Sequence, residues 1–138
     1  MMRPLAILLL LAMPCAATDL DSLVAEDKLR LRSWLEPETN IVVGQEVKLV
    51  LEIATPRWFA GGTRVSAPEI PGVVVLQRDV FATNLSRREG GDTWVLQQWR
   101  LEMYPQREGR VRVPRVSIEL AVNDADAGIV RGSLLSQA

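Results

Sequence analysis

Apolar and polar residues alternate along much of this chain, and a period of two is typical of strands with one buried face. In the segment 42–55, Val47, Leu49, Leu51 and Ile53 alternate with mostly charged or polar neighbours. A helix would need apolar residues at i, i+3, i+4 and i+7, and charged residues interrupt that spacing. Shorter stretches of the same kind predict further strands over residues 28–35, 63–66, 73–76, 80–87, 93–104, 110–113 and 115–122.

Proline and glycine separate these stretches in the way that turns between short strands require. Gly90-Gly91 is placed to turn a hairpin, Gly61-Gly62 ends a loop, and Pro68 and Pro71 bound an extended connection. About seven or eight short strands at this spacing predict an all-β fold, an immunoglobulin-like antiparallel β-sandwich over residues 28–122. We expect residues 18–27 to be an N-terminal lead-in and residues 123–138, where the period is lost, to be a flexible tail.

The first 17 residues follow a different pattern, which indicates a cleaved signal peptide. Arg3 precedes a continuous apolar run over residues 5–13, and small residues follow before the acidic start at Asp19. The run is shorter than the roughly 20 apolar residues that a membrane-spanning helix needs. Cys15 raises the alternative of a lipoprotein, but Pro14 directly before it suits that processing poorly. We therefore expect a periplasmic or otherwise exported protein, and we disfavour a lipid anchor through Cys15.

Composition narrows the possible chemistry further. The chain has no histidine and one cysteine, so histidine-dependent triads and histidine-ligated metal sites are excluded. Carboxylate-only chemistry remains open, but the acidic residues fall at alternate strand positions or in turns, which is typical of solvated faces. The net charge of −1 argues against nucleic-acid binding. No second apolar stretch is long enough to cross a membrane, so we expect no transmembrane segment. From the residue types above, we also expect no catalytic residues, no bound metal and no cofactor.

The order of these features resembles the N-terminal β-domain of the BatD family, the oxygen-tolerance or aerotolerance proteins. The likeness covers about residues 29–122 and includes the stretches GQEVKLVLEI and APEIPGVVVL. Its most specific part is WRLEMYPQREGRVRVPRVSIEL, with Tyr104, Pro105, Gly109 and Pro114 before the strand that carries Val116, Ile118 and Leu120.

The resemblance implies a non-catalytic module that binds other envelope proteins. In that family the partners are von Willebrand A-type proteins and a MoxR-type ATPase system, acting in envelope stress or oxygen tolerance. An unrelated exported immunoglobulin-like domain for carbohydrate binding or adhesion is the alternative, although the single tyrosine argues against an aromatic sugar-binding face. A hydrolase that uses two carboxylates is a third hypothesis, without a paired-acid motif to support it.

Five residues are candidates for partner binding. Arg57, Trp58 and Phe59 precede Gly61-Gly62 and could form an exposed knob, since tryptophan and arginine are frequent at interface hot spots. We favour the alternative that Trp58 or Phe59 plugs the end of the sandwich. Glu69 and Asp92 lie in turns, where an exposed carboxylate could complete the metal site of a von Willebrand A-type partner.

Two tryptophans share the segment 93–104 and must face opposite sides of it, because they are five residues apart. Trp99 shares a face with Leu101 and Met103, so we assign it to the core. Trp94 is then expected to be partly exposed.

Overall fold

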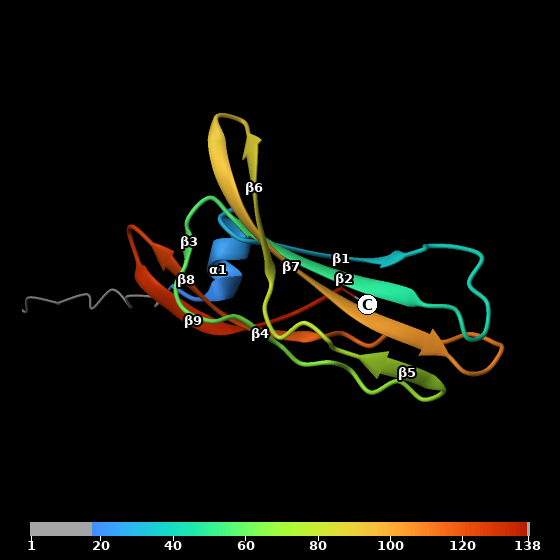
Figure 1. Ribbon diagram of the computed structural model, residues 1–138. Helices are drawn as coiled ribbons and strands as arrows, with labels where there is room; N and C mark the ends of the chain where they lie inside the picture. The colour runs from blue at the N-terminus through green and yellow to red at the C-terminus, as the bar shows by residue number, and fades with distance from the viewer. Residues whose placement is uncertain (1–17, 138) are drawn as a thin grey trace, which may run out of the picture.

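Two antiparallel sheets make up most of the molecule, seen in a computed structural model that describes residues 18–137 (Figure 1). The all-β prediction is confirmed. The expected signal peptide, with Cys15, lies outside the described residues, so it stays a prediction.

Sheet A contains the longest strand, β7, which pairs with β2 on one side and with two shorter strands on the other. The β6 strand pairs with the first half of β7, and β5 pairs with its last residues. The β1 strand closes the far edge beside β2. The bounds in sheet A are β1 Arg30–Glu36, β2 Val47–Thr55, β5 Val73–Leu76, β6 Thr83–Glu89 and β7 Asp92–Pro105.

Sheet B is smaller and is centred on β8, which carries β9 along one edge and two two-residue strands along the other. Its bounds are β3 Trp58–Phe59, β4 Arg64–Val65, β8 Ser117–Asp124 and β9 Gly128–Leu135. The β3 strand falls inside the segment 57–62, which the sequence suggested was a loop. Two residues are too few to show a period of two.

The core lies between the sheets and consists of the alternating residues that the sequence pointed inward. The buried residues from sheet A include Leu49, Leu51, Ile53, Trp99 and Leu101, and those from sheet B include Val116, Ile118, Leu120 and Val122. The assignment of Trp99 to the core is confirmed. Burial of this apolar surface is the main stabilising contribution, at about 25 cal/mol per Å² removed from water.

A short helix, α1 (Leu20–Ala25), occupies the segment expected to be an irregular lead-in. Asp19 caps it by accepting a hydrogen bond from the Ser22 backbone N–H at 2.8 Å. Leu20 and Leu23 point into the core between the sheets. A helix of six residues has room for only these two inward positions, which is too little to show helical periodicity in the sequence.

The segment expected to be a flexible tail, 123–138, instead completes β8 and forms β9, so this expectation was wrong. Val130 and Leu134 are the buried residues of β9, and Gly132 falls between them. A Cβ atom at Gly132 would lie 3.2 Å from Leu20 Cδ1, so the core contact there is made by the backbone. The missing side chain hides the alternation that marks the other strands.

The segment 110–113 was predicted to be a strand and is not one. Its Arg-Val-Arg-Val alternation is present, and Val113 packs against the core, but no neighbouring strand pairs with it in residues 18–137. A period of two shows that a segment can cover a surface, whereas a strand also needs a partner from elsewhere in the chain.

Candidate binding groove

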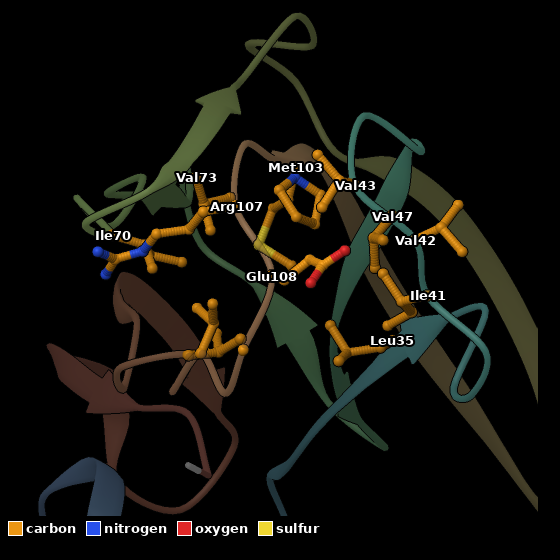
Figure 2. A pocket seen from close by; sticks show the side chains of 14 residues that line it. Leu35, Ile41, Val42, Val43, Val47, Ile70, Val73, Met103, Arg107 and Glu108 are labelled. Carbon is orange, nitrogen blue, oxygen red and sulfur yellow. The ribbon is translucent and has the colours of Figure 1, made fainter.

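An apolar groove of about 760 Å³ opens at the end of the molecule opposite α1, and Figure 2 shows the side chains around it. Its size falls in the range of ligand sites in proteins, which are mostly apolar with a few polar groups. Fourteen residues line it: Leu35, Ile41, Val42, Val43, Val47, Ile70, Val73, Met103, Pro105, Arg107, Glu108, Gly109, Val111 and Val113.

The floor of the groove is the inner face of sheet A. Leu35, Val47, Val73 and Met103 come from four different strands of that sheet and point to the core side. No lining residue belongs to a strand of sheet B. The β8 strand begins only at Ser117, so sheet A extends past the region that sheet B covers.

The first wall is the connection between β1 and β2, which places three β-branched residues in a row at the rim. Ile41, Val42 and Val43 are all exposed, Val42 by 64%. The Gly44 N–H donates to the Pro105 carbonyl at 2.8 Å and ties this connection to the end of β7. Gly44 has a φ of 79°, a conformation that glycine adopts readily.

The second wall follows β7 and runs from Arg107 to Val113. The Gln106 N–H donates to the Gly72 carbonyl at 2.8 Å, which fixes the start of this segment against the connection before β5. The Arg107 side chain lies over Gly72, where a Cβ atom would be 2.5 Å from its Nε. In Figure 2 the Arg107 guanidinium lies on the Ile70 side, while the Glu108 carboxylate points across the groove.

Chemically, this arrangement is suited to binding. Apolar side chains make up most of the lining, and the charged groups are limited to Arg107 and Glu108. Desolvating the apolar side chains favours an apolar occupant, and the two charged groups can set its orientation. The sequence holds two signals of this groove: the apolar run at residues 41–43, and the Val111/Val113 alternation.

The structure separates Trp58 from its neighbour Phe59. Trp58 is 69% exposed, whereas Phe59 is partly buried against the core. The plug interpretation therefore fits Phe59 and is wrong for Trp58. Successive residues of a strand point to opposite faces, so only one of the two can face inward.

Arg57 is part of an ion pair inside the fold. Its Nε donates to Asp124 Oδ1 at 3.0 Å, and the Asp124 side chain is 2% exposed. The Lys28 ammonium lies 3.9 Å from the other carboxylate oxygen. A buried carboxylate needs such partners, so Arg57 compensates the charge of Asp124 within the fold. Its expected role in partner binding stays a prediction, and the contact leaves less of its charge free for a partner.

Glu69 and Asp92 are both exposed, as their turn positions suggested. Asp92 starts β7 at the tip of the β6–β7 hairpin, and Glu69 precedes Ile70, which bridges to Val73 opposite the other end of β7. A strand rises about 3.3 Å per residue, so the length of β7 separates the two carboxylates by roughly 40 Å. The structure therefore does not bring the five predicted residues into one site, and Glu69 alone borders the groove region.

Trp94 is 5% exposed on the outer face of sheet A, so the expectation that it would be partly exposed was wrong. The Arg30 guanidinium carbon lies 3.9 Å from the Trp94 ring centroid and covers the ring. Arg30 also donates to Asp27 and Glu89 at 2.7 to 2.9 Å. Long arginine stems can cover apolar surface on a face that alternation alone assigns to solvent.

The same outer face buries Glu52. Gln98 Nε2 donates to Glu52 Oε2 at 2.7 Å, and Arg32 and Arg87 lie 3.9 and 3.7 Å from its oxygens. These three contacts compensate the buried charge of the Glu52 carboxylate, so its burial is explained by packing within sheet A. Over residues 18–137, no group of three or more carboxylate or thiol side chains is placed to hold a metal ion.

The one helix described, α1, is far shorter than a membrane span, and within residues 18–137 none qualifies as one. Comparisons with protein-family models, with curated proteins and with solved structures gave no match.

Proposed function

We propose that this protein is an exported, non-catalytic interaction module that binds another envelope protein through the groove. The observation that carries the proposal is the apolar groove, where no strand of sheet B contributes to the lining and where Ile41, Val42 and Val43 are exposed at the rim. Exposed apolar surface of this kind, rimmed by charged residues, is typical of interaction sites. The apolar leader over residues 5–13 supports export.

The BatD resemblance supplies the identity of the partner in this proposal. A von Willebrand A-type protein, working with a MoxR-type ATPase system, is the partner class that it implies. The immunoglobulin-like assignment belongs to the same proposal and is supported by two antiparallel sheets around one core. Of the two carboxylates that the sequence suggested, Glu69 borders the groove region and Asp92 does not, so Glu69 is the one proposed to reach a metal site on such a partner.

A pull-down from the envelope fraction tests the proposal, with the captured proteins identified by mass spectrometry. We expect the wild-type protein to recover a von Willebrand A-type protein and Val42→Asp to lose it, because a carboxylate at the rim makes apolar contact unfavourable. The matched control is Val80→Asp, at an exposed valine that does not line the groove. Both substitutions are at the surface, so melting temperatures should stay close to wild type.

Equal recovery by Val42→Asp and wild type would show that the groove is not the binding site. Failure of the wild-type protein to recover such a partner, combined with its retention on a polysaccharide column, would contradict the proposal and favour carbohydrate binding.

A further inference from the structure

The second wall of the groove is a strand-like segment whose backbone is unpaired. Residues 107–115 make no backbone–backbone hydrogen bond to the rest of residues 18–137. Free N–H and C=O groups along such a segment form a template for another extended chain. The side chains alternate as in a strand, because Val111 and Val113 line the groove while Arg110 and Arg112 are exposed outside it.

The groove and the unpaired segment lie together. Leu35 and Val73 on the groove floor are only partly buried, and they face the side where sheet B would continue if it were longer. An extended chain paired with residues 110–113 would occupy that place. Its alternate side chains would then point down onto the apolar floor, which is the geometry of strand addition.

Charge indicates what the other side chains of that chain should be. Arg107, Arg110, Arg112 and Arg115 are all exposed, and the ion pairs formed within residues 18–137 do not include them. Opposite charges on directly paired strands stabilise the pairing, and like charges oppose it. Glu38 lies in the connection that forms the other wall, whereas Glu108 is the only acidic residue of the segment 107–115, so an acidic chain is directed to the arginine side.

Resting on the proposed function, we propose that the groove binds an extended segment of the partner protein by adding it as a strand along residues 110–113. The segment has apolar residues at alternate positions and acidic residues between them. Its apolar side chains pack against Leu35 and Val73, and its carboxylates face Arg110 and Arg112. A second copy of this chain fits less well, because its own segment with valine, leucine and glutamate, residues 46–53, is already paired within sheet A.

Synthetic peptides test this mode of binding directly. The probe is a labelled peptide of about nine residues that alternates valine and glutamate. The first control has the same composition in paired order, with two valines followed by two glutamates, and the second replaces glutamate by lysine. Strand addition requires the period of two, so we expect the alternating acidic peptide to bind about tenfold more tightly than either control, measured by fluorescence anisotropy.

Two further measurements locate the contact. Hydrogen exchange followed residue by residue by NMR should slow at alternate amides of residues 110–113 when the peptide saturates, because one edge of a strand pairs through alternate residues. The double variant Arg110→Glu/Arg112→Glu should prefer the alternating lysine peptide. Arg88→Glu, a matched change on the exposed β6–β7 hairpin, should keep the wild-type preference.

Equal binding of alternating and paired peptides, or unchanged exchange over residues 107–115, would overturn strand addition. The proposed function would survive that result if Val42→Asp still abolished recovery of the envelope partner. Peptide-independent dimerisation in the same samples, seen by light scattering and lost in Val42→Asp, would assign the groove to a second copy and overturn the proposal too.

Discussion

The two ends of the sandwich are built differently, although the same strands run between them. At the α1 end, Leu23 fills the space between the sheets, and the Arg57–Asp124 ion pair lies where β8 finishes. At the groove end, sheet A continues past sheet B, and connecting segments form the only cover described. One end is closed by buried side chains and the other leaves apolar surface open. We therefore expect stability to depend more on the α1 end, and the proposed binding to use the groove end.

The largest expected effect is on the free energy of unfolding, which should depend on buried side chains at the α1 end and not on exposed ones at the groove rim. Leu23→Ala should lower the free energy of unfolding by about 3 kcal/mol, because Leu23 is fully buried and its loss leaves a cavity. Val24→Ala, at an exposed position on the same helix, should change it by no more than about 0.5 kcal/mol. Val42→Ala at the groove rim should be equally mild. Urea unfolding measures all three, and a loss of about 2 kcal/mol in Val42→Ala would contradict the comparison.

A smaller effect distinguishes adjacent residues at the α1 end. Arg57→Ala should cost about 2 kcal/mol, because it leaves the buried Asp124 carboxylate with a weaker partner. Trp58→Ala should leave the melting temperature within about two degrees of wild type, because its side chain is mostly in solvent. Thermal unfolding of both variants is the measurement. A fall of many degrees in Trp58→Ala would restore the plug interpretation.

The smallest expected effect is on the pH dependence of stability, and we expect it to be similar at both ends of the sandwich. A hydrogen bond from Arg30 holds the pKa of Asp27 below its ordinary value, and one from Arg78 does the same for the pKa of Glu102. A lowered pKa contributes stability above the unfolded pKa, and this contribution is lost as pH falls through the folded pKa. Asp27→Asn and Glu102→Gln should therefore be slightly less stable than wild type at about pH 7.

At about pH 3 both differences should shrink, because this pH lies below the ordinary pKa of both carboxyls, where the contribution of a lowered pKa begins to be lost. Denaturant midpoints at the two pH values provide the test. A difference that grows on acidification would contradict the direction of these pKa shifts.

The sequence predicted the strands well wherever one face packs on the core, because alternation records burial directly. Val47 to Ile53 in β2 and Trp99 to Met103 in β7 are clear cases. The sequence pattern failed where the alternation of apolar and polar side chains does not match which residues are buried. Gly132 hid the period of β9, and Arg30 covered Trp94 on the outer face.

The candidate site was harder to predict, because it depends on which segments remain without partners. Arg110 to Val113 has the alternation of a strand, and only the tertiary structure shows that β8 begins four residues later. The exposed valines of the groove rim belong to the apolar run at residues 41–43. The sequence pattern assigned this run to the strand predicted over residues 42–55, whereas β2 begins at Val47. The five predicted binding residues were chosen singly for their chemistry, and the fold distributes them over separate places.

The β6 strand presents a free edge in the hairpin that projects beyond the sandwich (Figure 1). Every residue of β6 is exposed, and Arg87, Arg88 and Glu89 occupy its last three positions. Charged side chains on a free edge oppose pairing with a like edge on another molecule. During storage at high concentration this hairpin should therefore resist growth into β-linked aggregates.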